Sequence, residues 1–401
     1  MEKTVCELFA GVGGFRLGLE KTLKGWNTVW FSQWEPGKKN QWAHDCYVKH
    51  FGDIDNNTGI DISLVNKTEI PDHNLLVGGF PCQDYSVARS LIGEQGINGK
   101  KGVLWWQIRD TLIAKETPFV LLENVDRLLK SPSKQRGRDF GIILACLNSL
   151  NYSAEWRVIN AAEYGGPQRR RRIYIYAYKN TTKYGRSIGK ITPETIISKE
   201  GFFSKSFNIE NLSQISTKSI ECEHIADISD TFSFKFENAG YMHNGQVFTS
   251  KVTPKLESPI PLKSIMEKKV DEKYFIPTDK LEKWKYLKGA KKIMRTSKSG
   301  FKYKFSEGAI SFPDKIDLPA RTLLTSESTL NRSSHVIEDF STKKLRLLTP
   351  LETERIQGFD DNWTDTGMPH RFRYFCMGNA LVVQMITRMG NTLADIFDKE
   401  N

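Results

Sequence analysis

The first 178 residues alternate short apolar runs with longer stretches of helical spacing. Six runs predict β-strands, at residues 4–11, 28–35, 73–80, 118–125, 153–160 and 171–178. Amphipathic or largely apolar stretches between them predict helices, most clearly at 14–25, 102–115 and 138–150. Strands that alternate with helices are typical of an α/β fold around a parallel sheet, which presents its functional residues at the carboxyl ends of the strands.

The pattern changes after about residue 181. The sequence becomes rich in Ser, Thr, Lys and Asn, with no clear helical repeat until the 280s, which predicts a second domain of loops and small sheets. Helical spacing returns at 375–397, where one face carries Met377, Leu381, Met385, Met389 and Leu393. A helix with such an apolar face must pack against a core. We expect it to pack on the N-terminal sheet, so that the large domain is discontinuous in sequence.

Length and composition agree with two domains. The chain has 401 residues, 39% of them hydrophobic, and single cores stop growing at about 250 to 300 residues. No apolar run approaches the roughly 18 residues that cross a bilayer, and the N-terminus does not resemble a secretion signal. We therefore expect a cytosolic protein without a membrane partner.

The net charge of +11 is concentrated in one region. Residues 251–304 hold 16 Lys and Arg against 6 Asp and Glu, an excess of +10, with aromatic residues between the cations. Such a segment suits a polyanion with stackable bases, although a solvated lysine-rich surface is an equal alternative for the segment alone.

The six cysteines are scattered, without the spacing of a disulfide framework or a zinc site. They are Cys6, Cys46, Cys82, Cys146, Cys222 and Cys376. Only "ECEH", at Cys222 to His224, has metal-capable neighbours, and a solvated loop is the simpler interpretation. We expect no metal site.

A glycine turn follows the first strand in "FAGVGGFRLG", where Gly11, Gly13 and Gly14 let the backbone pass close to a ligand. Arg16 breaks the dinucleotide fingerprint GxGxxG, and a tight turn without a ligand is the alternative. Glu35, at the end of the next strand, can grip ribose hydroxyls, and Asp61 can receive an adenine amino group. Together these residues indicate an adenosine-like cofactor.

Three further motifs fall at predicted strand ends. Cys82 in "GGFPCQ" becomes a nucleophile if its thiol pKa falls, whereas a buried lone cysteine is commonly a small hydrophobe. Glu123 in "LLENV" follows an apolar strand, beside Asn124, which predicts a hydrogen-bonded turn. In "QRRRR", alternation along a strand puts Arg170 and Arg172 on one side, away from Arg169 and Arg171.

The ordered motifs "FAGVGG", "GGFPCQ", "ENV", "QRRRR", "PARTLLT", "RLLTPLETERIQGF" and "GNA" resemble those of DNA (cytosine-5)-methyltransferases. The resemblance spans Leu8 to Val383, apart from a variable stretch at about 181–315. It implies a Rossmann-like S-adenosylmethionine-dependent methyltransferase domain at 1–182 and 372–401. A smaller, irregular mixed target-recognition domain with a hinge is expected at 183–371.

The resemblance also implies site residues. The catalytic set is Cys82, which attacks cytosine C6, Glu123, which holds N3 and the amino group, and Arg172 with Arg170 beside it, which reach O2. The S-adenosyl-L-methionine set is Phe9, Ala10, Gly11, Gly13, Gly14, Glu35, Asp61, Ile62, Pro81, Leu104, Asn379 and Ala380. Two departures are Tyr85, where phenylalanine is common, and Gln384, near a common proline.

The implied substrate is a cytosine flipped out of double-stranded DNA. "QDYSVARSL", "VDRLLKSPSKQRGRDF", "RVINAAEYG" and "DISDTFSF" resemble bacterial restriction-modification methylases that act on GATC. The expectation is a monomer in the bacterial cytoplasm, associated with the nucleoid, whose cognate restriction endonuclease is a functional and not a physical partner.

Two other functions stay open at this point. A tRNA cytosine-5 methyltransferase uses the same motifs, but its variable region is short, and a catalytically silent DNA-binding regulator would not need a thiol at Cys82. A zinc deaminase would need PCxxC, and position 85 is Tyr85.

Overall fold

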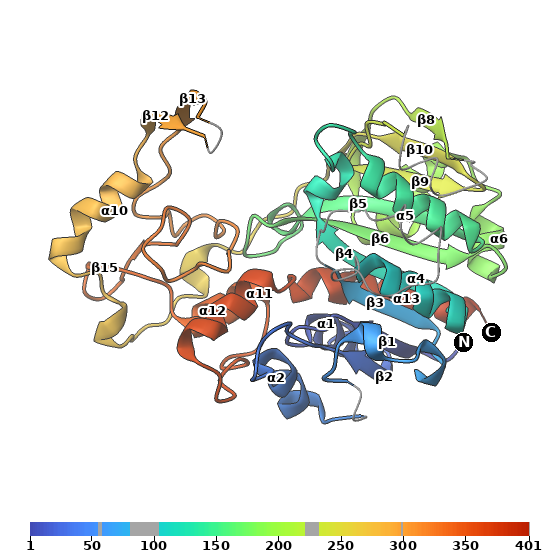
Figure 1. Cartoon of the computed structure of the whole chain (residues 1–401), viewed down its shortest axis with the longest axis horizontal. Helices are drawn as coiled ribbons and strands as arrows, with labels where there is room; N and C mark the ends of the chain where they lie inside the picture. Colours follow the sequence, from blue (N-terminus) through green and yellow to red (C-terminus); the bar gives the residue numbers. More distant parts are fainter. Residues whose placement is uncertain (55–57, 81–103, 221–231, 298–299, 401) are drawn as a thin grey trace. The chain divides into compact units, whose positions relative to one another are not determined.

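The computed structural model describes residues 1–54, 58–80, 104–220, 232–297 and 300–400 (Figure 1). These residues divide into two compact units, one of 1–165, 170–258 and 381–401, the other of 166–169 and 259–380. Each unit has its own core, and each is described by itself.

Within the described residues, the first unit is built on one sheet of nine strands, in the order β2-β1-β3-β4-β6-β5-β9-β10-β8. The strands are β1 (Thr4–Leu8), β2 (Asn27–Ser32), β3 (Leu75–Gly79), β4 (Phe119–Val125), β5 (Tyr152–Asn160), β6 (Arg171–Lys179), β8 (Ser216–Ser219), β9 (Ala239–His243) and β10 (Gln246–Ser250). All six strands predicted before residue 179 are present, which confirms the α/β fold class.

One strand direction differs from the prediction. β1, β2, β3 and β4 are parallel, but β6 is antiparallel to both of its neighbours, β4 and β5. Only the ten residues 161–170 connect β5 to β6. A parallel crossover needs a dozen or more residues, commonly with a helix, so this short connection requires an antiparallel pair.

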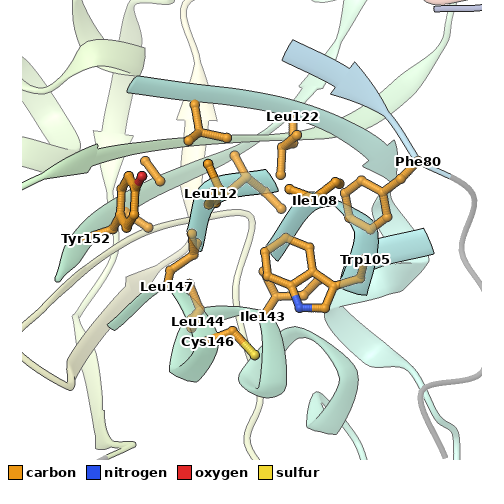
Figure 2. Packing of buried hydrophobic residues seen from close by; sticks show 14 of the residues in the cluster. Phe80, Trp105, Ile108, Leu112, Leu122, Ile143, Leu144, Cys146, Leu147 and Tyr152 are labelled. Carbon is orange, nitrogen blue, oxygen red and sulfur yellow. The ribbon is translucent and has the colours of Figure 1, made fainter. Parts of the chain in front are cut away.

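Helices cover both faces of the sheet. They are α1 (Gly14–Glu20), α2 (Trp42–Phe51), α4 (Leu104–Lys115), α5 (Arg138–Ser149), α6 (Lys183–Ile188), α7 (Pro193–Thr195), α8 (Phe202–Ser206) and α13 (Val383–Lys399). Alternate residues of β4 show why two layers form. Val120 and Leu122 join the core under α4 and α5 (Figure 2), whereas Phe119 and Leu121 join the core under α1 and α13.

The segment 183–258 belongs to the first unit, whereas the sequence analysis assigned it to the second domain. Its apolar residues explain the difference, because Ile196, Ile197, Phe202 and Phe203 pack in the same core as Tyr176. The segment adds β8, β9 and β10 to the sheet, and β7 (Ile209–Leu212) pairs with β11 (Val252–Pro254) beside it.

The C-terminal helical stretch is two helices. α12 (His370–Asn379) belongs to the second unit and α13 to the first, with Ala380 to Val382 between them. The predicted apolar face is buried throughout, from Met377 to Leu393. Along the chain, the boundary between the two observed units falls between residues 380 and 381. The predicted boundary falls between residues 371 and 372.

The second unit holds α10 (Leu281–Lys288), α11 (Pro350–Gln357) and α12, with the hairpins β12 (Lys291–Thr296)–β13 (Lys302–Glu307) and β14 (Ile337–Glu338)–β15 (Leu345–Arg346). Buried ion pairs supplement its small apolar core. Arg346 binds Asp339 and Glu352, and the Thr349–Glu352 capping box begins α11.

A buried carboxyl makes the stability of the first unit depend on pH. Glu155 in β5 lies under α8, where the Tyr184 hydroxyl donates to it at 2.9 Å, and burial raises its pKa from 4.5 to about 7. A raised carboxyl pKa stabilises the fold at low pH, and this stabilisation is lost as the pH rises through 7.

We therefore expect the free energy of unfolding to fall by roughly 1 kcal/mol more between pH 6 and pH 8 in the natural protein than in the E155Q variant. Urea unfolding at the two pH values measures the difference. Equal pH dependence in the two proteins would contradict the assignment.

Candidate active site

The turn after β1 forms the first wall of the candidate site. Phe9 and Gly11 have positive φ values of 56° and 58°, and Gly13 has φ 85° where α1 begins. Ala10 donates its N–H to the Ser32 carbonyl at 2.9 Å, and Gly11 donates to Gln33 Oε1 at 2.7 Å. The turn from Phe9 to Gly14 is thus tied to the end of β2.

Only glycine fits at position 13. A Cβ atom there would lie 2.4 Å from Cε2 of Phe51 and 3.2 Å from Cδ2 of Tyr47, and the left-handed backbone disfavours it further. We expect G13A to weaken S-adenosyl-L-methionine binding by about tenfold or more and to destabilise the fold by roughly 1–3 kcal/mol.

Calorimetric titration and thermal unfolding measure the two effects. Gly25 is the matched control, because it has φ 77° but no atom within 4 Å of its Cβ position. If G25A lost cofactor affinity as G13A does, the close approach at position 13 would not be the cause.

Two carboxylates lie in the part of the chain between β2 and β3. Glu35, three residues after β2, is half-buried; burial raises its pKa, and its Oε2 accepts the Ala43 N–H at 3.4 Å. Asp61 is half-buried and accepts the Ser63 N–H at 3.0 Å, and Ile62 beside it is buried. These are acceptor groups of the kind that bind ribose hydroxyls and an adenine amino group.

Leu104 begins α4 and packs partly buried against the larger core. Asn379 and Ala380 lie at the C-terminal end of α12, in the second unit. Pro81 and Cys82 lie outside the described residues. The glycine turn, Glu35 and Asp61 all belong to the first unit, and hydrogen bonds join the turn to Ser32 and Gln33, just before Glu35.

The residues of the first unit fit an adenosine-containing cofactor. The turn leaves open space at Gly11, where a Cβ atom would have no neighbour within 4 Å, and two half-buried carboxylates supply acceptors for hydroxyl and amino groups of a ligand.

Glu123 lies where β3 and β4 end side by side. It pairs in register with Gly79, and a Cβ atom on Gly79 would lie 3.4 Å from Glu123 Oε2. Arg172 Nε lies 2.8 Å from Glu123 Oε1, and the two side chains are 16% and 12% exposed, respectively. The carboxylate is thus held next to the strand that leads to Cys82.

The charged neighbours of Glu123 act on its pKa in the direction opposite to burial. Burial raises the pKa of Glu123, while Arg172 and then Arg170 lower it. Arg170 is 2% exposed, and burial lowers the pKa of its guanidinium, with Arg172 adding to the effect and Glu123 opposing it. Arg169 and Arg171 are exposed, which confirms the predicted alternation along "QRRRR".

Phe80, the last described residue before Cys82, is held on both sides. The Asn124 side chain donates to the Phe80 carbonyl at 2.9 Å and accepts the Val125 N–H at 2.8 Å. The expected hydrogen bonding is present, but Asn124 lies within β4 and not in a turn. Phe80 is buried and packs against Trp105 of α4, with ring centres 5.9 Å apart (Figure 2). The chain therefore leaves β3 from a rigid point beside Glu123.

Sequence reasoning missed Glu7, which is fully buried in β1 below the glycine turn. Tyr47 donates to its Oε2 at 3.0 Å, and burial raises the pKa of Glu7 to about 8, against the effects of Tyr47, Arg16 and the backbone of Phe15. The signal was an acid inside an apolar strand in "TVCELFAG".

In the second unit, the basic segment forms an exposed hairpin, β12–β13. One face of the paired strands carries Lys292, Met294, Thr296, Lys302, Lys304 and Ser306, all exposed. The other face includes Arg295, whose guanidinium lies 3.5 Å from the Phe305 ring centre. The lysine-rich face therefore carries positive charge without an acid among its paired residues.

Arg332, in "STLNRSSHV", holds both ends of this hairpin. It donates to the carbonyls of Leu287, Lys288 and Gly289 at 3.1–3.3 Å before β12, and to that of Gly308 after β13. Its Nε lies 3.4 Å from Glu307 Oε2. The structure thus gives Arg332 a supporting role for the hairpin.

The model of the C-5 cytosine-specific DNA methylases matches residues 3–395. The chain belongs to this family. It is 52% identical over 399 residues to the type II methyltransferase M.Sau3AI of Staphylococcus aureus, covering 98% of this chain and 95% of that protein. It is 27% identical over 397 residues to M1.ScrFI of Lactococcus lactis subsp. cremoris, covering 98% and 78%.

Solved structures with the same fold include the Entamoeba histolytica methyltransferase EhMeth, with a TM-score of 0.60 and 18% identity over 100% of this chain and 99% of that one. A Spodoptera frugiperda DNMT2 mutant has a TM-score of 0.61 and 15% identity over 97% and 99%. Both likenesses concern the fold.

This cytosine-5 DNA methylase is therefore a type II methyltransferase of a restriction-modification system, with DNA as its substrate and S-adenosyl-L-methionine as its methyl donor. No helix in the described part of the chain is long and apolar enough to cross a membrane.

Proposed function

We propose that the protein methylates C5 of the cytosine in GATC, after flipping this base out of duplex DNA, through a covalent bond between Cys82 and cytosine C6. The Glu123–Arg172 pair carries the proposal, since it places a nearly buried carboxylate beside Gly79, three residues before Cys82. The base must leave the stack because its ring atoms are otherwise inaccessible.

Cysteine and glutamate have complementary roles in this reaction. Cytosine C5 is a poor nucleophile, so the Cys82 thiolate first forms a bond to C6, while Glu123 protonates or hydrogen-bonds N3 and the ring becomes an enamine. Burial raises the pKa of Glu123, which favours the protonated carboxyl that donates to N3. S-adenosyl-L-methionine supplies the methyl group that C5 takes, and loss of the C5 proton then lets the C6–S bond break.

The two inward arginines hold this arrangement. Arg172 binds Glu123 and reaches cytosine O2, while Arg170 lies behind it and adds positive charge to a site that accumulates negative charge on the base. The S-adenosyl-L-methionine site comprises the turn from Phe9 to Gly14, with Glu35 for the ribose and Asp61 for the adenine. The family resemblance also implies a cofactor role for Ile62, Pro81, Leu104, Asn379 and Ala380.

The second unit is the target-recognition domain in this proposal. A two-stranded ribbon has the size to enter the major groove of B-DNA, and the lysine-rich face of β12–β13 suits phosphates. Exposed Met294, Phe301 and Tyr303, with exposed fractions of 66%, 70% and 39%, add side chains that can contact bases and sugars.

We expect R332A to weaken binding to the cognate duplex by roughly tenfold and to reduce discrimination against a mismatched site, because both ends of the hairpin lose their support. The R332K variant keeps the charge but cannot bridge the same carbonyls, and should fall in between. Fluorescence anisotropy with the two duplexes measures both effects. An R332A protein with unchanged discrimination would contradict the role.

The GATC assignment rests on the motif resemblance and on the similarity to M.Sau3AI through the variable stretch. "DISDTFSF" contributes less than the sequence suggested, because its Phe232 is 6% exposed and packs in the core of the first unit. Its other residues before 232 lie outside the described ones.

Bisulfite sequencing of plasmid DNA, after incubation with the purified protein and S-adenosyl-L-methionine, tests the assignment. Methylcytosine in GATC alone is expected, and methylation in another context would refute it. With labelled methyl donor, transfer to tRNA instead of DNA would favour the tRNA enzyme.

The protein acts as a monomer in this proposal, since each turnover modifies one cytosine of one strand. Its cognate restriction endonuclease is a partner in function without physical contact, and the work takes place in the bacterial cytoplasm at the nucleoid. Sedimentation with and without duplex DNA tests the monomer.

A further inference from the structure

A polar cavity opens in the first unit next to Arg171, the first residue of β6. It has a volume of about 320 Å³ and is lined by the end of β5, the short helix η5 (Ala161–Glu163), Arg171 and β11. This volume corresponds to about ten water molecules, so a phosphate group fits inside. The whole cavity lies in the first unit.

Its lining is cationic. Arg157, Arg171 and Lys251 contribute positive charge, and Glu163 is the acid among the lining residues. The Glu163 carboxylate accepts from Asn160 Nδ2 at 3.2 Å. Arg171, with 57% of its side chain exposed, pairs with Asp126 at 3.3 Å, a solvated contact that a stronger anion can replace.

Arg157 is a buried cation without a full counter-charge. Its side chain is 2% exposed and donates to the carbonyls of Phe207 and Ile197 at 3.0 and 2.5 Å. Among the described residues its Nε has no hydrogen-bond partner, and burial lowers the pKa of its guanidinium while Tyr164 and Glu155 raise it. A buried charge of this kind favours an anion in the adjoining cavity.

The cavity lies at the edge of the sheet that carries the base site. Arg171 pairs in register with Asn160, and the next residue, Arg172, contacts Glu123. Successive strand residues are about 3.3 Å apart and point to opposite faces. Arg172 pairs with Val125, the last residue of β4, and Arg171 pairs with Asn160, the last residue of β5, so Arg171 lies at the same edge of the sheet as Glu123. DNA bound at this edge can reach Arg171, whose side chain points to the face opposite to that of Arg172.

We propose that this cavity binds a backbone phosphate of the DNA strand that carries the target cytosine. Arg171 and Lys251 contact the phosphate, and Arg157 supplies positive charge from behind. Lys251 comes from the segment 183–258, so the segment that extends the sheet also contributes to DNA binding. The inference rests on the base site proposed at Glu123.

Duplexes with a single neutral methylphosphonate linkage, placed in turn at each position near the cytosine, test the proposal. R171Q and K251Q should each weaken binding about three- to tenfold and lower the slope of log K against log salt by about 0.9, whereas K24Q, which changes an exposed lysine near the chain termini, should do neither. One linkage position should weaken binding by the natural protein but cause no further loss in R171Q.

Additive losses at every linkage, or R171Q binding like K24Q, would overturn the proposal. So would competition by inorganic phosphate that R171Q abolishes without any change in DNA affinity, because the cavity would then serve a free anion. Covalent trapping of cytosine at Cys82 in R171Q separates this failure from a failure of the proposed function.

Discussion

Replacing Cys82 with serine is expected to lower methyl transfer to DNA by roughly 10⁴-fold or more, since a hydroxyl is not ionised at neutral pH and the covalent route is lost. Binding of DNA and of S-adenosyl-L-methionine should stay within about threefold of the natural protein, because the positive charges and the glycine turn are unchanged. Tritium transfer to a GATC duplex and anisotropy with the same duplex measure the two effects.

C222S is the control for the general effect of removing a thiol, because the four described cysteines, Cys6, Cys46, Cys146 and Cys376, are buried in the cores. It should methylate DNA at the natural rate. A C82S protein with more than a few per cent of the natural rate would require another nucleophile.

Replacing Glu123 with glutamine is expected to lower kcat by about 10²–10⁴-fold, because the amide cannot pass a proton to cytosine N3. The amide keeps the shape of the side chain but weakens the contact with Arg172, now 2.8 Å from the carboxylate. DNA affinity should change little, so that kcat falls while KM for DNA does not rise in proportion.

The E155Q variant is the matched control, because Glu155 is also a buried carboxyl of this sheet but lies under α8. Its kcat should stay near the natural value. If E123Q lost activity only in parallel with its folded fraction, measured by circular dichroism, Glu123 would be a structural residue.

The period and spacing of apolar residues along the chain were sufficient to predict the strands of the central sheet. The strand residues of β1, β3 and β4 are nearly continuous apolar runs, which is what a strand buried on both faces requires. The reversed direction of β6 follows from the short connection 161–170, a constraint that the apolar pattern does not contain.

The segment 183–258 shows where local patterns fail. Its short helices and strands are stabilised by aromatic residues such as Phe202 and Phe203, which pack against Tyr176 far away in sequence. Intrinsic propensities alone do not predict such elements, because burial in a distant core decides them.

The candidate site was predicted unevenly. The inward positions of Arg170 and Arg172 followed from strand alternation and are observed. The hydrogen bonds of Asn124 are also observed, but the residue lies within β4 and not in the predicted turn. The buried acids Glu7 and Glu155 are not distinguishable in sequence from surface acids, since their pKa values depend on surrounding residues from several elements. Cys82 lies outside the described residues, so its role rests on chemistry and family.

The most direct test of the covalent mechanism uses a GATC duplex whose target base is 5-fluorocytosine, incubated with the protein and S-adenosyl-L-methionine. Fluorine at C5 cannot leave as a proton does, so the account predicts a stable protein–DNA adduct that survives denaturation and maps by peptide mass spectrometry to Cys82. Active protein that forms no adduct, or one that maps to another residue, would contradict it.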